Sequence, residues 1–394
     1  MKTFFEAPVG VSIVGSGHTA FGRLDKSLEE LILAASREAL EDAAIDAKDV
    51  DAVFLGHFNA GLVADGFASS LIHQVDAGFR FKPAMRCENA CASGAAAILS
   101  GIRAIQAGAA KTVLVVGAEK MTSRSTPEVT RALGNAGYQH DPAEVDLSFP
   151  QVFALAAKAY RETYGDPAVA MARIAEKNHR NAVSNPLAQM RREVSFEFCN
   201  EVSDKNPVIA DPLRLMDCSL ITDGAAAIVL TAEDNAKAFK KSVRFRSAVH
   251  VSDYLPLSRR DFLEFEGPSL TILRALSEAE VTISDIDFAE VHDCFTIAEL
   301  LIYEAMGLAP KGRGIEALEA GTVYRDGALP VNLSGGLKAK GHPVGATGVS
   351  MHALSYRQLT GIAGDIQIDH ASLGLVFNMG GSAVANYVSI LEAA

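Results

Sequence analysis

Cys91 is the residue whose surroundings most resemble those of a nucleophile. It directly precedes the small-residue run ASGAAAILSGIRAIQAG, which predicts that a helix begins after a turn. A thiol at a helix N-terminus faces unpaired N–H groups and the positive end of the helix dipole, and both lower its pKa by stabilising the thiolate. Free cysteines are also common as inert core residues. Cys91 is therefore a candidate nucleophile, with a packed thiol as the alternative.

His342 lies in a glycine-rich loop, NLSGGLKAKGHPVGATG, which has five glycines between positions 335 and 348. The backbone of such a loop can approach a ligand closely. The imidazole could simply cap a turn. If two halves of the chain face each other, however, it meets Cys91 and forms the pair in which a base activates a thiol.

His292 and Cys294 follow the strand-like run IDFAEV and precede the helical pattern TIAELLIYEAMG. Because α/β folds bind ligands at the carboxyl ends of their strands, both side chains are positioned for a site. They could supply a hydrogen-bond donor and a proton carrier, or both could be packed in the core. A metal site would need further ligands close by, and none is evident along the chain.

Two glycine-containing segments carry weaker signals. GSGHTAFG at 15–22 lacks the glycine spacing of a dinucleotide loop, so a turn at the end of a strand is favoured. NMGG at 378–381 predicts a turn between two apolar strands. Its backbone N–H groups could serve an oxyanion, or the segment could be a plain hairpin turn.

The composition is that of a globular protein that folds throughout. Of the 394 residues, 49% are apolar and 21% are charged. The 36 Lys and Arg against 48 Asp and Glu give a formal charge of −12, which disfavours nucleic-acid binding because a polyphosphate backbone is repelled. Five cysteines without a CxxC pair predict neither a disulfide framework nor a zinc ribbon, and indicate a reducing compartment, the cytoplasm.

Neither end of the chain predicts membrane targeting. The N-terminal MKTFFEAPVGVSIVGSG lacks the long apolar core and the cleavage site of a secretory signal. The stretch 371–391 is uncharged, but its Asn and Ser residues and its Gly380-Gly381 break predict two short buried strands around a turn. We therefore expect no membrane span.

Strand-like apolar runs alternate with helical patterns, which predicts an α/β fold. The first strand is expected at 11–17, a helix at about 27–44 and a second strand at 50–56. This alternation recurs near the end of the chain.

Two pairs of segments repeat in the same order. ALEDAAIDAKDVDAVFLGH (39–57) aligns without gaps with ALSEAEVTISDIDFAEVHD (275–293). CASGAAAILSGIR (91–103) resembles GATGVSMHALSYR (345–357) in its small residues, its Ser/Thr-Gly step and its helix. Two such pairs predict duplicated halves, each with its own sheet.

We therefore predict an N-terminal half over 1–120 that returns at 211–241, a C-terminal half over 242–394 and an inserted cap over 121–210. The cap is polar and rich in Asn, Arg and Pro. Its local excess of cations could hold a phosphorylated ligand, or it could form a solvated helix face. These cations are Arg173, Lys177, Arg180, Arg191 and Arg192.

Taken together, the segments resemble the thiolase family, and more closely its sterol-carrier-protein type branch and the acetyl-CoA acetyltransferase-like proteins near it. The resemblance implies a five-layered αβαβα core of two similar halves with a loop domain, assembled as a homodimer or homotetramer. It spans nearly the whole chain through CENACASG (87–94), GAEKMT (117–122), KNHRNAVSNPLAQ (177–189), DCSLITDGAAAIVL (217–230), EVHDCF (290–295) and NLSGGLKAKGHPVGATG (332–348).

The resemblance also implies roles for individual residues. Cys91 would take the acyl group, and His342 would be the base that activates it. His292 and Cys294 occupy the HDCF element, where this branch has His in place of Asn and places its second acid–base cysteine. Gly380 matches the glycine whose N–H, with that of Cys91, polarises the acyl-enzyme carbonyl. Most thiolases carry Cys-x-Gly-Gly here, whereas this chain has Asn378, so Cys294 would replace the missing cysteine.

The resemblance thus implies a CoA-thioester acyltransferase of lipid metabolism that forms an acyl-cysteine. It would cleave 3-ketoacyl-CoA with CoA or condense acyl-CoAs, with CoA and acyl-CoA as substrates, no permanent cofactor and no metal. Two alternatives stay open. One is a decarboxylating condensing enzyme of the ketoacyl-synthase type, and the other is a thiolase-fold subunit that needs, or merely scaffolds, a small accessory subunit.

Overall fold

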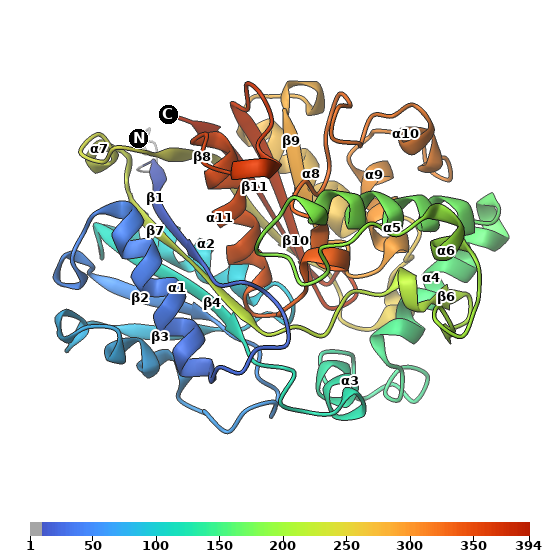
Figure 1. Cartoon of the computed structure of the whole chain (residues 1–394), viewed down its shortest axis with the longest axis horizontal. Helices are drawn as coiled ribbons and strands as arrows, with labels where there is room; N and C mark the ends of the chain where they lie inside the picture. Colours follow the sequence, from blue (N-terminus) through green and yellow to red (C-terminus); the bar gives the residue numbers. More distant parts are fainter. Residues whose placement is uncertain (1–9) are drawn as a thin grey trace, which may run out of the picture.

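A nine-stranded sheet runs through the computed structural model, which describes residues 10–394 (Figure 1). Its strand order is β3-β2-β4-β7-β1-β8-β11-β10-β9, so strands from the two ends of the chain form two adjoining groups. The groups meet where Ser12 and Ile13 pair with Arg244 and Val243. The strands are β1 (Val11–His18), β2 (Ala52–Gly56), β3 (Ala84–Cys87), β4 (Thr112–Glu119), β7 (Gly224–Ala232), β8 (Val243–Ser252), β9 (Phe288–Val291), β10 (Leu373–Gly380) and β11 (Ala385–Ala393).

The two groups of strands repeat one topology, which confirms the predicted duplication. The predicted separate sheet for each half is wrong, because the pairing of β1 with β8 joins both groups into one sheet. In the N-terminal half β2 and β4 are parallel, and β7 is antiparallel to both β4 and β1. In the C-terminal half β9 and β10 are parallel, and β11 is antiparallel to both β10 and β8. The counterpart of β3, which is parallel to β2, is a parallel bridge between Ala289 and Val331.

Four helices repeat in the same way. The 39–57 and 275–293 segments each cover a helix end, a short turn and a strand, and the 91–103 and 345–357 segments each cover a helix start. The first of these helices is capped locally: Ser27 accepts from the N–H of Glu30, whose side chain accepts from the N–H of Ser27. The four helices are α1 (Leu28–Ala43), α2 (Ser93–Gln106), α8 (Glu266–Glu278) and α11 (Thr347–Leu359).

Side-chain alternation along β4 explains the layers. Leu114 and Val116 pack with α1, whereas Val113 and Val115 face the opposite side of the sheet. There they share a core with α2, α11 and the C-terminal strands. Because α8 covers the outer face of the C-terminal strands, the order of layers is αβαβα, as predicted. Figure 1 shows α11 in this middle layer.

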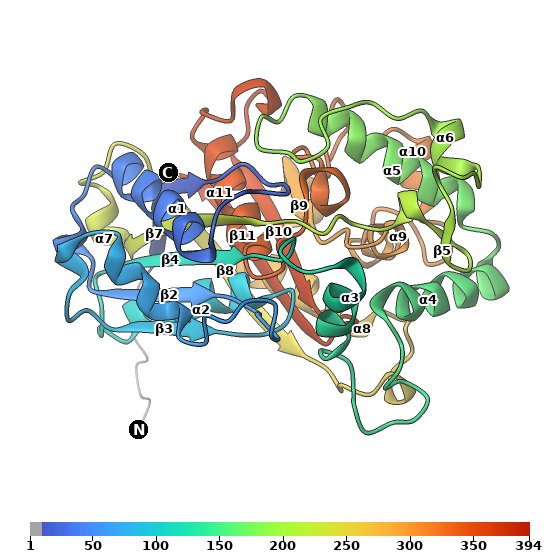
Figure 2. The same cartoon turned by 60° about the horizontal axis from the view of Figure 1, so that its bottom comes forward.

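The segment between β4 and β7 forms a helical region that packs beside α9 and α10, as both views show (Figures 1 and 2). After this region, β7 rejoins the N-terminal strands at Gly224. The predicted domain boundaries near 120, 210 and 241 stay predictions. The remaining elements are α3 (Thr126–Gly134), α4 (Phe149–Tyr164), α5 (Ala168–Val183), α6 (Phe196–Asn200), β5 (Val208–Ala210), β6 (Leu213–Arg214), α7 (Glu233–Ala236), α9 (Thr296–Ala305) and α10 (Ile315–Glu319).

The uncharged 371–391 stretch forms the β10–β11 hairpin, as predicted. Within residues 10–394, none of the helices has both the length and the apolar character needed to span a bilayer. The expectation about a secretory signal falls in part on residues 1–9, which lie outside the described residues.

Candidate active site

A cavity of about 360 Å³ brings three of the predicted chemical side chains onto a common wall: Cys91, Cys294 and His342. The exposed residues Ile209 and Leu215 mark its opening beside β5 and β6. The rest of the lining is mainly apolar and comes from both halves and the inserted segment, including Met121, Val129, Leu133, Phe149, Leu220, Ile221, Phe295 and Val344.

Cys91 lies in a turn directly before α2, as predicted, and the preceding residue Ala90 has a φ of +50°. The predicted low thiol pKa is wrong. Burial raises the pKa of Cys91 to about 12 and outweighs the backbone N–H of Gly381, which acts to lower it. The hydration free energy that a thiolate loses in this cavity is larger than the stabilisation that the helix N-terminus and a single N–H group provide.

This raised pKa predicts slow alkylation of Cys91 in the free protein. Compared with a cysteine of pKa about 8.5, the fraction of Cys91 present as thiolate at pH 7 is about 3000-fold lower. A more basic thiolate is also a better nucleophile, which compensates for part of this loss, so iodoacetamide labelling should be about 100-fold slower. The rate should rise about tenfold per pH unit up to pH 10, because thiolate accumulates as the pH approaches the pKa. Peptide mass spectrometry of the labelled protein reads the rate at Cys91 alone. Labelling faster than that of free cysteine would contradict the raised pKa.

The ring of His342 is held in one tautomer. Its Nδ1 lies 2.7 Å from the Thr347 hydroxyl oxygen, which in turn donates to the carbonyl of Pro343 at 3.1 Å. The hydroxyl oxygen therefore accepts from Nδ1–H, and Nε2 keeps its lone pair. Burial and the nearby Lys340 lower the pKa of His342 to about 3, so the ring is neutral at pH 7. A neutral ring with a free Nε2 is the form that a general base requires.

His292 and Cys294 lie in the loop between β9 and α9. The rings of His292 and His342 are nearly perpendicular, with centroids 5.0 Å apart. Burial, with the neighbouring Cys91, raises the pKa of Cys294 well above its ordinary value, so this thiol keeps its proton at pH 7. The possible ligand atoms of Cys91, His292 and His342 lie within 4.8 Å of one another. The fold thus joins residues from three distant segments, and the expected absence of a metal stays a prediction.

A buried polar network that the sequence analysis missed holds this loop. Asp293 accepts from Asn178 Nδ2 at 2.7 Å and from the N–H groups of Leu337 and Lys338. The side chain of Asn178 also donates to Glu299 at 2.6 Å. Asn178 of the 177–189 segment therefore positions the loop through Asp293. A helical charge pattern alone does not reveal this, because Asn178 lies 115 residues from Asp293 and 121 residues from Glu299.

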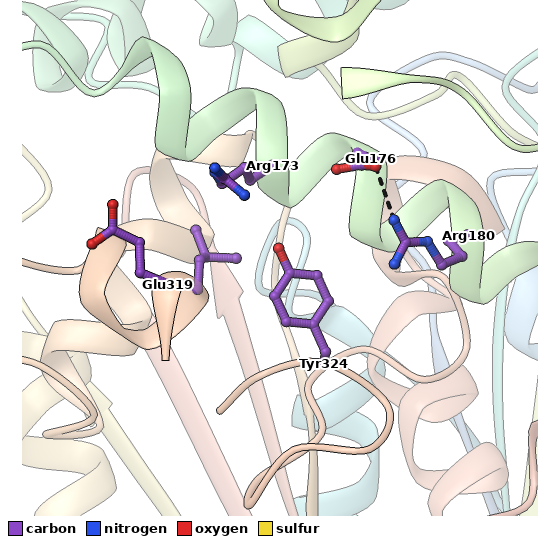
Figure 3. A pocket seen from close by; sticks show the side chains of 6 residues that line it. Arg173, Glu176, Arg180, Glu319 and Tyr324 are labelled. Atoms are coloured by element: carbon purple, nitrogen blue, oxygen red, sulfur yellow. Dashed lines mark hydrogen bonds and ion pairs between the residues drawn. The ribbon is translucent and has the colours of Figure 1, made fainter. Parts of the chain in front are cut away.

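The cationic stretch of α5 divides into two faces. Lys177 is buried and pairs with Glu299 at 2.9 Å, so its predicted role as a cation for a phosphorylated ligand is wrong. Arg173 and Arg180 instead project into an open pocket, where Arg180 pairs with Glu176 at 2.8 Å (Figure 3). This pocket shares no lining residue with the cavity of Cys91. For these two arginines, the role in holding a phosphorylated ligand stays a prediction.

Glu119 is a second buried acid that the sequence analysis did not single out. Its carboxylate accepts from the N–H groups of Phe58, Asn59 and Gly345 at 2.9–3.1 Å. It therefore ties the end of the N-terminal sheet to the loop that follows His342. The available signal was a glutamate at the end of the otherwise apolar run VLVVGAE.

The hairpin turn after β10 lies against Cys91. Gly381 has a φ of +63°, which favours glycine, and its N–H contacts the Cys91 thiol. A Cβ on Gly380 would overlap the carbonyl oxygen of Asn89. The N–H in contact with the thiol thus belongs to Gly381 and not to Gly380. The oxyanion role of Gly380 stays a prediction.

Comparison with known proteins agrees with this geometry. The chain matches the model of the thiolase N-terminal domain over residues 11–234 and that of the thiolase C-terminal domain-like family over 250–393. The acetyl-CoA acetyltransferase of Methanothermobacter thermautotrophicus is 39% identical over 376 residues, which cover 94% of this chain and 96% of that protein. Sterol carrier protein 2 of Homo sapiens is 32% identical over 394 residues, covering 94% of this chain and 70% of that protein.

A solved structure supports the fold. The Ltp2-ChsH2(DUF35) aldolase superposes with a TM-score of 0.83 at 22% identity, and the match covers 98% of each chain. Both family models together cover nearly all of the described residues, and their division falls between the two duplicated halves. The chain therefore belongs to the thiolase family of CoA-thioester acyltransferases.

Proposed function

We propose that this protein cleaves a 3-ketoacyl-CoA with CoA, and runs the reverse Claisen condensation, through an acyl thioester on Cys91. The observation that carries the proposal is the shared wall of Cys91, Cys294 and His342 in one apolar cavity. A nucleophile, a base and a second proton carrier can there reach adjacent carbons of one substrate.

The tautomer of His342 and the two raised thiol pKa values support a sequence of steps. As the Cys91 sulfur attacks the 3-keto carbonyl, His342 Nε2 takes its proton, so a thiolate forms only when substrate is present. The bond between the two carbons breaks, and the enolate of the departing acyl-CoA takes a proton from Cys294. The thiol of CoA then attacks the acyl thioester and gives its proton to the Cys294 thiolate, while the departing Cys91 sulfur takes back the proton that His342 holds. Covalent catalysis divides one difficult step into two easier ones.

His292 would donate to the thioester oxygen while enolate charge develops on it. One such donor is worth about 3 kcal/mol in a site that excludes water. The N–H groups of Cys91 and Gly380 would polarise the acyl carbonyl in the same way. CoA and acyl-CoA act as substrates in this scheme, which uses no permanent cofactor.

We infer that the preferred acyl group is longer than acetyl. The inner lining of the cavity is mainly aliphatic and aromatic, as in Leu133, Phe149 and Phe295. Burying a methylene group against such walls is worth about 0.8 kcal/mol, which corresponds to about a fourfold gain in kcat/KM per CH₂. A two-carbon acyl group would be too short to pack against these apolar walls.

A chain-length panel tests both proposals. Purified protein is incubated with CoA and 3-ketoacyl-CoAs of four to twelve carbons, and cleavage is followed by the loss of the 3-ketoacyl-CoA enolate absorbance. We expect kcat/KM to rise with chain length from acetoacetyl-CoA until the cavity is filled. A maximum at acetoacetyl-CoA would favour the acetyl-CoA C-acetyltransferase type instead. No cleavage at any length would contradict activity of the chain on its own.

We further propose a homodimer as the minimal assembly, in the cytoplasm. β3 stands at one end of the sheet with an exposed Met85, and exposed Phe67 and Phe81 precede it in sequence. An apolar open edge of this kind favours pairing with a second copy. All five cysteines are free thiols, which suits a reducing compartment. A small accessory subunit stays a proposal too, because the aldolase structure named above carries a DUF35 component in its title.

A further inference from the structure

The Asn378 side chain lies between the backbone of the proposed nucleophile and the second histidine of the site. It is fully buried in β10. Its Nδ2 lies 2.9 Å from Nδ1 of His292 and 3.3 Å from the carbonyl oxygen of Cys91. One amide group thus contacts two segments that are 201 residues apart along the chain, as the sequence separations of 287 and 86 residues from Asn378 show.

These two contacts determine which way the amide faces. A carbonyl oxygen only accepts hydrogen bonds, so the group facing Cys91 must be the NH₂. The same NH₂ has a second hydrogen, which is directed at His292 Nδ1. The amide oxygen faces Gly348 and has no hydrogen-bond partner within residues 10–394. The opposite orientation would place the amide oxygen of Asn378 against the carbonyl oxygen of Cys91.

We propose that Asn378 is a positioning residue that fixes the tautomer of His292. Because Nδ1 accepts from Asn378, the single ring proton lies on Nε2, and His292 presents an N–H donor to the cavity. Burial and the nearby His342 lower the pKa of His292 well below its ordinary value, so the ring holds that one proton only. Thr347 holds His342 in the opposite tautomer. Two adjacent imidazoles are thus assigned different tasks, one as proton acceptor and one as donor.

This tautomer also opposes zinc binding by the same cluster. Cys91, His292 and His342 place their possible ligand atoms within 4.8 Å, and zinc binds thiolate and the lone pair of a neutral imidazole. An Nε2 that carries a proton has no lone pair to offer. For zinc to bind, the proton of His292 would have to move to Nδ1, where it would meet the NH₂ of Asn378.

The substitution Asn378→Asp reverses this arrangement with little change in size. An aspartate accepts from Nδ1–H, frees Nε2 and creates the carboxylate–histidine pair that strengthens zinc sites. Asn378→Ala is the matched control, because it removes the contact without imposing either tautomer. Cys91→Ser in the Asn378→Asp background tests whether any bound zinc lies at this cluster.

The first measurement uses the unaltered protein. A ¹⁵N NMR spectrum of histidine-labelled protein, with the His292 signals assigned by their loss in His292→Ala, should show Nε2 protonated and Nδ1 unprotonated. The second is zinc affinity by competition with a chromophoric chelator. We expect Asn378→Asp to bind Zn²⁺ about 10–100-fold more tightly than the unaltered protein, and more tightly than Asn378→Ala. The added Cys91→Ser should remove the gain.

Because the donor role of His292 rests on the proposed function, thiolysis is the third measurement. Asn378→Asp should lower kcat by about 10²–10³-fold with KM changed only a few-fold, which is the loss expected for one oxyanion donor. A proton on Nδ1 in the unaltered protein overturns the proposal, whether or not the variants fold. Zinc affinity of Asn378→Asp no higher than that of Asn378→Ala also overturns it. The NMR and zinc measurements need no turnover, so they remain decisive even if the chain-length panel fails.

Discussion

Cys91→Ala should abolish thiolysis, with kcat lowered by about 10⁴-fold or more. The residue would supply the sulfur that forms the covalent intermediate, and this sulfur lies within 4.8 Å of a ring nitrogen of His342. Removing the nucleophile of a covalent mechanism leaves only substrate binding and the oxyanion donors, which account for a small part of the rate enhancement. The rate is measured by 3-ketoacyl-CoA cleavage.

Intact-protein mass spectrometry gives a second readout for this variant. Incubation with acyl-CoA should add one acyl mass to the unaltered protein and none to Cys91→Ala. Cys87→Ala is the matched control, because its thiol lies four residues earlier, faces Ser100 and is not part of the cavity lining. We expect this control to keep its activity within about threefold, as for most substitutions away from a site. An acyl adduct that persists in Cys91→Ala would place the nucleophile elsewhere.

Cys294→Ala should separate the two half-reactions. Cleavage of the carbon–carbon bond should fall by about 10²–10⁴-fold, because general acid catalysis at the departing carbon is lost. Acylation of Cys91 by a simple acyl-CoA needs no proton at that carbon, so exchange of labelled CoA into acyl-CoA should stay within about tenfold of the unaltered protein. The raised pKa of Cys294 is consistent with this role, since a thiol that stays protonated at pH 7 can donate to an enolate.

Cys294→Ser distinguishes chemistry from packing. Its hydroxyl fills nearly the same volume but is a far weaker acid, so carbon–carbon cleavage should be as slow as in Cys294→Ala. Recovery of most of the rate by Cys294→Ser would point to a packing role for this residue.

The same variant also decides between the alternatives. Turnover of a malonyl thioester that survives Cys294→Ala would favour the decarboxylating condensing enzyme, because loss of CO₂ generates the carbanion without proton transfer. Failure of the unaltered protein to become acylated at Cys91 would favour the subunit that depends on a partner.

Much of the fold could be read from the sequence because its signals are local. α1 begins where Ser27 and Glu30 form a reciprocal cap, and the spacing of its apolar residues shows the face that packs on the sheet. The duplication can be recognised because corresponding segments of the two halves form the same helix, turn and buried strand, and therefore share the same pattern of residue types. The inner strands are covered on both faces, and they accordingly appear as continuous apolar runs.

The structure brings Cys91, Cys294 and His342 onto one cavity wall with His292 beside them, and their catalytic roles stay predictions. The thiol pKa of Cys91 was predicted in the wrong direction. A helix N-terminus is visible in sequence, and it lowers a thiol pKa. The depth at which Cys91 is buried depends on walls contributed by both halves and the inserted segment. Desolvation sums over all of those atoms, so no local pattern reports its size.

The sequence by itself determined the fold class, the duplicated halves and the candidate side chains, because periodicity, capping and motif spacing act over short stretches of chain. Only the tertiary structure decided which groups orient them. Lys177 meets Val331 across 154 positions, and Asn378 meets Cys91 across 287. A hydrogen bond needs its partners within about 3 Å and correctly aligned, and only the packing of distant segments brings such atoms together.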